Sequence, residues 1–280
     1  MQEIKRVTGD RAKLTIFYDP FNARIRIDKY AGNLEEVTSL IEQAASDGSI
    51  HKVIIKARGE HLQFFLEKGF ELEAVIKGFF NGGDLFFMSR FKTMARKNSS
   101  YWEKAEKIYS DVRLLKQETA NPLYKFKIHK AGPEDAERLA SLYEKIFEVY
   151  PVPLQKTEYV RSSMASGTVF LYIEKDKEII SAASAEIDTV QGNAELTDCA
   201  TLPSYRGSGL MKQLLSGLEE ELSQQQIYCV YTIARSLSFG MNAAFKQLGY
   251  RYGGRLVNNC YIYDKIEDMN VWWKDLSQDD

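Results

Sequence analysis

The sequence predicts an α/β fold, of the α+β kind, divided into two units. Strand-like and helix-like segments alternate along most of the 280 residues, and a polar, lysine-rich stretch interrupts them after residue 91. Near residue 200 a strand runs through two glycines directly into a helix. Hydrophobic residues make up 44% of the chain and charged residues 27%, which is typical of globular proteins that bury sizeable cores.

Residues 1–91 are predicted to form a smaller N-terminal α/β unit, and residues 92–123 a helical linker. Apolar alternation, Asn33 before a helix and a hairpin signal at Asn81-Gly82-Gly83 indicate the elements of this unit. We expect strands at Leu14–Tyr18, Ala23–Tyr30, Lys52–Ala57, Phe70–Phe79 and Asp84–Phe91, and helices at Leu34–Ala45 and His61–Lys68. In the linker we expect a helix at Tyr101–Lys116, before a break at Asn121-Pro122.

Residues 124–280 are predicted to form a second, larger unit. Its first elements are a strand at Phe126–His129, a helix from Pro133 to about Val149, an extended loop at Tyr150–Pro153, a helix at Thr157–Ala165 and a hairpin of Thr168–Glu174 with Glu178–Ile187. The strand that ends before Pro203 is followed by a helix at Leu210–Ser223, a strand at Ile227–Ile233, a helix at Met241–Leu248, and a strand, turn and strand within Arg251–Tyr263.

The segment Arg206-Gly207-Ser208-Gly209-Leu210 joins a strand to a helix and predicts a phosphate-binding loop. Glycines let the backbone approach a ligand, and the N–H groups at a helix N-terminus bind phosphate oxygens. A dinucleotide-binding loop needs a third glycine where this chain has Lys212, and the sequence has no Walker-type Gly-Lys-Ser/Thr run. An ordinary strand–helix turn remains the alternative to a phosphate site.

Composition excludes several classes of function. The net charge of −2 argues against nucleic acid as the main partner. The sequence has no apolar run of transmembrane length, and its start is too polar for a signal peptide, so we expect no membrane partner. The three cysteines fall in predicted core strands and indicate a reducing cytoplasm. These cysteines and the three histidines lack the spacing of metal ligands, so no metal is expected. A homo-oligomer stays open at this stage.

The Arg-Gly-x-Gly loop between strand and helix resembles motif A of the GNAT acetyltransferase superfamily. The order of elements in residues 124–280 resembles a complete GNAT domain, which implies a mixed central sheet with splayed strands and acetyl-CoA as co-substrate. The coenzyme contacts implied by this match are Ala200, Leu202, Arg206, Gly207, Ser208, Gly209, Leu210 and Ser238. Two positions depart from the family pattern: Ser204 stands in place of Gln or Arg, and Ser238 in place of Asn.

The N-terminal unit contains a segment that is similar to a segment of the second unit. The segment from His61 to Phe70, followed by a hairpin, parallels the segment from Asn242 to Tyr250, which is followed by another. We therefore expect the N-terminal unit to resemble a truncated GNAT half. Because it has no Arg-Gly-x-Gly loop, we do not expect it to bind the coenzyme. A chance likeness between two helices that end at glycine is the alternative.

Glu195 is the predicted general base, because an amine must lose a proton before it attacks a thioester. The strand Ala194–Ala200 resembles that of histone-acetylating GNAT relatives, which carry a catalytic glutamate four residues before a cysteine. Asp198 is the second candidate, as a base or as a carboxylate that holds a substrate ammonium group. A structural ion pair is the alternative for Glu195, and Cys199 is expected to be a buried packing residue.

Protonation of the leaving thiolate is less well predicted. Many GNAT members use a tyrosine in the last helix, and Phe245 stands at that position here. Tyr231, Tyr250 and Tyr252 are nearby substitutes, although core packing is favoured for the first two. Otherwise the thiolate takes its proton from the substrate or from water.

Nearly the whole chain resembles the β-lysine N-acetyltransferases. The resemblance rests on Thr197–Gly207, Gly249–Asn259, Asp268–Trp272, the Tyr150-Pro151 loop and the Gly78–Gly82 hairpin. It implies acetylation of the ε-amine of β-lysine to give Nε-acetyl-β-lysine, an osmolyte. This small amine has two ammonium groups and one carboxylate, so the candidates to bind it are Tyr150, Asp198, Tyr252, Arg255, Asn258 and Asn259, of which the last three equally suit turns. Another amine (a polyamine, lysine or a protein lysine) and a non-catalytic coenzyme-binding protein remain alternatives.

Overall fold

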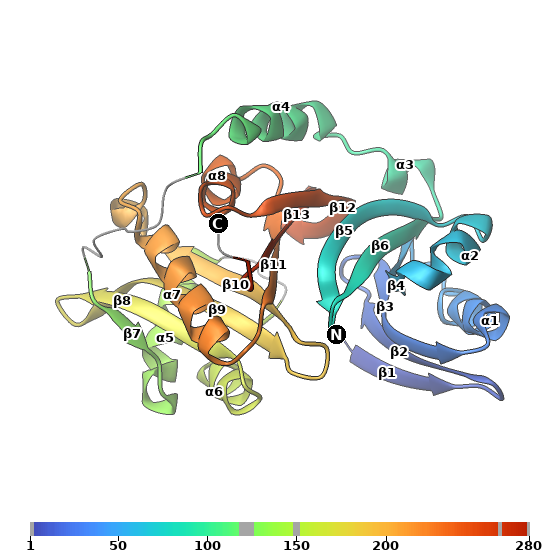
Figure 1. Cartoon of the computed structure of the whole chain (residues 1–280), viewed down its shortest axis with the longest axis horizontal. Helices are drawn as coiled ribbons and strands as arrows, with labels where there is room; N and C mark the ends of the chain where they lie inside the picture. The colour runs from blue at the N-terminus through green and yellow to red at the C-terminus, as the bar shows by residue number, and fades with distance from the viewer. Residues whose placement is uncertain (1–2, 118–125, 148–151, 263–264, 279–280) are drawn as a thin grey trace.

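The computed structural model describes residues 3–117, 126–147, 152–262 and 265–278 (Figure 1). The N-terminal elements are β1 (Glu3–Thr8), β2 (Ala12–Asp19), β3 (Arg24–Gly32), α1 (Leu34–Ala44), β4 (Lys52–Arg58), α2 (Leu62–Glu67), β5 (Glu71–Phe80) and β6 (Gly83–Phe91). Two helices follow, α3 (Met94–Lys97) and α4 (Trp102–Arg113). The remaining elements are β7 (Ile128–Lys130), α5 (Ala136–Ile146), α6 (Thr157–Ala165), β8 (Val169–Lys175), β9 (Glu178–Asp188), β10 (Asn193–Thr201), α7 (Leu210–Gln224), β11 (Cys229–Arg235), α8 (Phe239–Gln247), β12 (Arg251–Ile262) and β13 (Lys265–Asp275).

The described strands form one mixed sheet that runs through both units. Its order is β1-β2-β3-β4-β6-β5-β12-β13-β11-β10-β9-β8-β7. The pairs β3–β4 and β10–β11 are parallel, because a helix crosses over between the two strands of each pair, whereas the hairpins are antiparallel. The predicted α/β class with a mixed sheet is therefore confirmed.

The N-terminal unit repeats the order of the C-terminal half. The run β2-β3-α1-β4-α2-β5-β6 corresponds to β9-β10-α7-β11-α8-β12-β13, and the two sets of strands take the same places in the sheet. The units meet through the corresponding strands β5 and β12, which lie side by side near the middle of the molecule (Figure 1). This is the arrangement expected of a duplicated half-domain.

The prediction of a strand, turn and strand within Arg251–Tyr263 was wrong. This segment is one long strand, β12, whose partner is β13, and its turn-like residues form two bulges. Asn258 adopts φ +43° within the second bulge. Gly254 has φ +140°, and a Cβ atom there would lie 2.2 Å from the carbonyl oxygen of Glu73 on β5. The glycine therefore allows β5 to pair with β12 and the two units to share one sheet.

A buried ion pair holds this junction together. Lys52 of β4 is fully buried, and its Nζ lies 2.7 Å from a carboxylate oxygen of Glu73. Lys52 also donates to the carbonyl oxygen of Val257 at 2.7 Å, and the other oxygen of Glu73 accepts from the backbone N–H of Val257 at 2.7 Å. All three groups satisfy one another, which is the condition under which buried charges are tolerated.

Helices cover both faces of the sheet in the C-terminal half. Alternate residues of β8 divide between two cores, with Leu171 in the core beneath α7 and α8 and Phe170 in the core beneath α5 and α6. In the N-terminal unit, α1 and α2 cover one face, and the other face packs against β11, β12 and β13. The helix at Thr157–Ala165 has its predicted bounds, whereas β1 and α3 were not predicted.

Candidate active site

The glycine loop enters α7 with its backbone open to solvent. Gly207 has φ +77°, and Gly209, the residue that caps α7, has φ +83°, a region that residues with side chains rarely adopt. A Cβ atom on either glycine would meet nothing within 4 Å, so the space in front of the loop is free. The first turn of α7 carries no acidic residue, which leaves its positive end for an anion. The loop therefore fits the pyrophosphate of a coenzyme.

The other predicted coenzyme contacts gather around the same end of the sheet. Arg206 and Ser208 are exposed, and Arg206 Nε donates to the carbonyl oxygen of Thr201 at 3.2 Å. Leu202 is half-buried, as is Ser238 at the start of α8. The two buried members, Ala200 and Leu210, belong to the cores on opposite faces of the sheet. The contacts themselves stay predictions.

The strands β10 and β11 separate just beyond Glu195. Over the described length of both strands, the paired residues are Asn193–Cys229, Ala194–Val230 and Glu195–Tyr231. On the other side of β10, the register with β9 moves from Thr197–Ser184 to Ala200–Ala182, so that two residues of β10 stand against one of β9. This bulge directs β10 away from β11 and produces the splayed strands that were expected.

Asp198 lies in this bulge, and its backbone adopts φ +52°. Its carboxyl group is buried, with only 4% of the residue exposed, and accepts a hydrogen bond from Ser184 Oγ at 2.7 Å. Bulges re-aim a side chain without breaking a strand, and here the bulge turns a carboxyl group toward the residues of β9. Asp198 is therefore held as an acceptor near the predicted base.

Glu195 is half-buried on β10 and stands directly opposite Glu186 of β9. Burial raises the pKa of Glu195, against the attraction of Lys56 and Arg26 and a hydrogen bond from Tyr231. Like charges directly opposite one another repel, so two facing carboxyl groups require either nearby positive charge or a proton on one of them. A half-buried carboxyl group with a raised pKa suits a general base that must take a proton near neutral pH.

Glu186 is a candidate that the sequence reasoning missed. Its side chain is exposed to solvent and faces Glu195 across the two paired strands. Desolvation, followed by repulsion from Glu195 and Asp198, raises its pKa to about 7. The only local signal was a single charged residue near the end of a strand of small residues, from Ser181 to Ala185. Glu186 becomes a candidate for function only because Glu195 stands opposite it on β10.

Charged side chains of the N-terminal unit lie within electrostatic reach of these carboxyl groups. Arg26 Nε lies 2.5 Å from Asp28 Oδ1, and Lys56 Nζ lies 3.5 Å from the same oxygen. Burial opposes ionisation of Asp28, but Arg26 and Lys56 outweigh it and lower its pKa to about 2. Lys56 Nζ is also 5.4 Å from the ring of Phe79, whose centroid is 5.3 Å from that of Tyr231.

A hairpin turn secures this contact between the units. The backbone N–H of Asn81, between β5 and β6, donates to the carbonyl oxygen of Gln191 at 2.9 Å, and its side chain donates to Val190 at 2.8 Å. In return, Asn193 Nδ2 donates to the carbonyl oxygen of Phe79 at 2.9 Å. The β5–β6 turn therefore docks on the β9–β10 turn, next to the strands that carry Glu186 and Glu195.

Comparison with known proteins agrees with this geometry. Residues 136–250 match the acetyltransferase (GNAT) family. N-acetyltransferase YodP of Bacillus subtilis is 36% identical over 98% of this chain and 100% of its own length, and beta-lysine N(6)-acetyltransferase of Methanosarcina mazei is 34% identical over 87% and 98%. The chain belongs to the GNAT acetyltransferase family. The solved ribosomal-protein-S18-alanine N-acetyltransferase of Escherichia coli aligns with a TM-score of 0.48 and 17% identity, covering 55% of this chain and 96% of that one.

As a GNAT acetyltransferase, the protein uses acetyl-CoA. The tyrosines near the site are the candidates to protonate the thiolate of the departing coenzyme. Phe245 is fully buried and packs edge-on against Tyr250 at 5.0 Å. Burial raises the pKa of Tyr250 well above its usual range, and Tyr252 stacks on Tyr109 at 4.1 Å. Of the predicted substitutes, Tyr231 is the one bonded to Glu195, and burial also raises its pKa strongly.

Cys199 of the GNAT domain is half-buried in the bulge, where desolvation and the charge of Asp198 raise the pKa of its thiol. A thiol that stays protonated is a poor nucleophile, which agrees with the packing role that was expected.

Two predicted substrate contacts, Arg255 and Asn258, are engaged elsewhere in the fold. Arg255 is buried, donates to Asn270 Oδ1 at 3.0 Å and lies 3.4 Å from Glu106 of α4. Asn258 Nδ2 donates to carbonyl oxygens of Arg96 and Asn98 and so caps α3. Asn259 is buried in the same bulge. The contacts of Arg255 and Asn258 join β12 to α4 and α3 instead of reaching the carboxyl groups of β9 and β10. Tyr150 lies outside the described residues.

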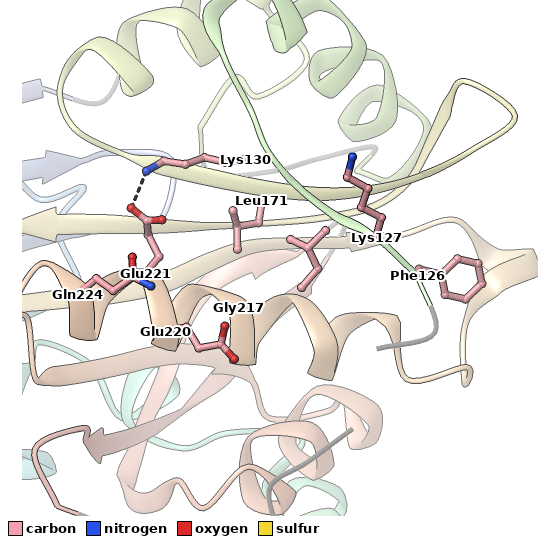
Figure 2. Close-up of a pocket in the computed structure, with 9 residues that line it drawn as sticks. Phe126, Lys127, Lys130, Leu171, Gly217, Glu220, Glu221 and Gln224 are labelled. Atoms are coloured by element: carbon pink, nitrogen blue, oxygen red, sulfur yellow. Dashed lines mark hydrogen bonds and ion pairs between the residues drawn. The ribbon is translucent and has the colours of Figure 1, made fainter. Parts of the chain in front are cut away.

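A hollow of about 610 Å³ opens elsewhere on the GNAT domain, between β7 and α7. Figure 2 shows Lys130 reaching across it to Glu221, with Phe126 and Gly217 in its wall. It lies apart from the carboxyl groups of β9 and β10. In the part of the chain that the structure describes, no group of three or more metal-binding side chains comes together. No helix among those residues combines the length and the apolar character needed to cross a membrane.

Proposed function

We propose that the protein transfers an acetyl group from acetyl-CoA to the ε-amine of β-lysine, giving Nε-acetyl-β-lysine, a compatible solute. The observation that carries this proposal is the gathering of Glu186, Glu195 and Asp198 where β10 leaves β11. An acceptor with two ammonium groups meets these carboxyl groups with complementary charge. The 34% identity to a relative named for β-lysine, over most of both chains, supports the same acceptor.

The chemistry follows from the positions of the side chains. Acetyl-CoA, when bound, supplies the acetyl group as a thioester. Glu195 takes the proton that the acceptor nitrogen must lose, while Glu186 and Asp198 hold the positive charge of the acceptor. Backbone N–H groups released from the ladder at the bulge are candidates to bind the thioester oxygen. The departing thiolate takes a proton from the acceptor nitrogen or from water.

A polyamine, lysine or a protein lysine is the alternative acceptor, and a coenzyme-binding protein without turnover is the alternative class. We also propose a cytoplasmic location, because all three cysteines are free thiols.

Thiol release from acetyl-CoA distinguishes these possibilities when β-lysine, lysine, spermidine and a histone peptide are compared. We expect a kcat/KM for β-lysine well above that for the other three amines, and mass spectrometry should locate the acetyl group on the ε-nitrogen. Preference for spermidine or the peptide would replace β-lysine as the acceptor. Coenzyme binding without thiol release from any amine would leave only the non-catalytic class.

A further inference from the structure

We propose that Arg26 and Lys56 of the N-terminal unit bind the carboxylate of the acceptor, so that both halves of the chain build one substrate pocket. This inference rests on the proposed amino-acid acceptor. It assigns a task to the unit that lacks the coenzyme loop. The acceptor would then lie between a basic wall from β3 and β4 and an acidic wall from β9 and β10.

The charges of the two walls are complementary. Arg26 and Lys56 share a single carboxylate, Asp28, so the cluster keeps a net positive charge. The opposite wall presents Glu186 and Glu195. Both cations act on the ionisation of both glutamates, which places the two walls within electrostatic reach of each other. A substrate with a carboxylate at one end and an amine at the other matches this division of charge.

The accessibility of these cations separates them from the structural ion pairs of the same sheet face. The side chain of Lys52 is fully buried against Glu73, and that of Arg24 is 8% exposed against a fully buried Asp19. Arg26 and Lys56 instead keep 26% and 14% of their side chains exposed. Solvent therefore reaches the cluster, which is the first condition for a small anion to bind there.

The route from the cluster to the base is short. Lys56 lies against the ring of Phe79, Phe79 lies against Tyr231, and Tyr231 stands opposite Glu195 where β11 pairs with β10. The docking of Asn81 on the β9–β10 turn holds this route in place. An extended amino acid that contacts the cations at one end can therefore present its far amine to Glu195.

The same two cations have a second explanation, which is that they only adjust the pKa of Glu195. Carboxylate binding acts on acceptors that carry a carboxylate, whereas adjustment of the base acts on every acceptor. The test therefore compares β-lysine with 1,4-diaminopentane, which is β-lysine without its carboxylate, and lysine with 1,5-diaminopentane. Steady-state thiol release gives kcat and KM for each acceptor as a function of pH.

In Lys56→Gln we expect KM for β-lysine to rise about tenfold to a hundredfold, as for the loss of one charge-assisted contact. When each enzyme is compared at its own pH optimum, which sets aside a shift in the pKa of Glu195, the kinetics of 1,4-diaminopentane should change less than threefold, and Lys56→Arg should keep the preference for the carboxylate. Arg26→Gln should act in the same direction. Lys13→Gln, which removes the same charge from an exposed position on β2, is the matched control.

An equal loss for both members of each pair, with a common shift in the pH profile, would overturn the carboxylate site. A wild-type enzyme that acetylates only amines without a carboxylate would overturn the proposed acceptor. If no amine is acetylated, calorimetry with β-lysine decides the inference separately from turnover. Binding that weakens in Lys56→Gln supports the site, and an absence of binding to the wild-type protein refutes it.

Discussion

Replacement of Glu186 by Gln tests whether the facing carboxyl groups act as a unit. In the wild-type protein the pKa of Glu186 is about 7, so the pair keeps one proton at mildly acidic pH. We expect the acidic limb of the pH profile of kcat/KM to have its midpoint near that value, because a protonated pair neither takes a proton nor holds an ammonium group well. The variant removes the carboxyl group whose pKa is about 7 and leaves the acidic limb to Glu195 alone. The midpoint for Glu186→Gln should therefore fall below that of the wild-type protein, together with weaker acceptor binding.

The assay is thiol release with β-lysine from acidic to mildly basic pH, with Glu178→Gln as control. Glu178 is an exposed glutamate at the start of the same strand, where it pairs with Lys145 at 2.7 Å. A midpoint that stays in place in Glu186→Gln would refute the reasoning. Stability provides a second measurement. The folded state holds a proton on Glu186 that the unfolded state has lost between pH 4.5 and about 7, so stability relative to the variant should fall as pH rises across that window.

The other variants test separate parts of the site. Glu195→Gln should lower kcat by about a hundredfold to ten-thousandfold and flatten its rise with pH, while calorimetry shows unchanged coenzyme affinity; an unchanged pH profile would exclude Glu195 as the base. Gly207→Leu should abolish coenzyme binding in calorimetry but cost only about 1–2 kcal/mol of stability, because the space around it is free and the cost is that of its positive φ. Lys52→Met should lower the free energy of unfolding in urea by about 3–5 kcal/mol, since Glu73 would stay buried without its partner. A smaller loss would show that water reaches the junction.

The elements with local signals were the ones that the sequence predicted. Asn33 accepts a hydrogen bond from the backbone N–H of Glu36 and starts α1 where it was expected. β1 escaped prediction because its residues are mostly exposed, so no apolar alternation marks it. β12 was divided in two because Gly253-Gly254 and Asn258 are typical of turns. Their real cause is the close approach of β5, a strand that lies almost two hundred residues away in sequence.

The sequence predicted the site residues that lie together in one continuous segment, and it missed those that other segments bring to the site. The glycine loop and Glu195 belong to one strand–loop–helix segment, so the resemblance of that segment to GNAT motifs could indicate both. Glu186 is a candidate only because Glu195 lies opposite it on the neighbouring strand. Lys56 is a candidate only because the fold brings it from the N-terminal unit within electrostatic reach of Glu195. Arg255 was predicted as a carboxylate binder because it is a cation in the Gly249–Asn259 segment, which carries part of the family resemblance. The structure engages it with Asn270 and Glu106, because the long β12 brings it against α4.

The two corresponding helices explain why only one unit is suited to the coenzyme. Helix α7 begins after glycines, with no acid in its first turn and open space before its N-terminus. Helix α1 begins after Asn33 and carries Glu36 in its first turn, which accepts hydrogen bonds from the backbone N–H groups of Asp10 and Arg11 at 2.7 Å each. The positive end of α1 already has an anion of its own, and a pyrophosphate would be repelled there. With this helix end occupied, the N-terminal unit offers the other face of its sheet, which carries Arg26 and Lys56, to the proposed acceptor.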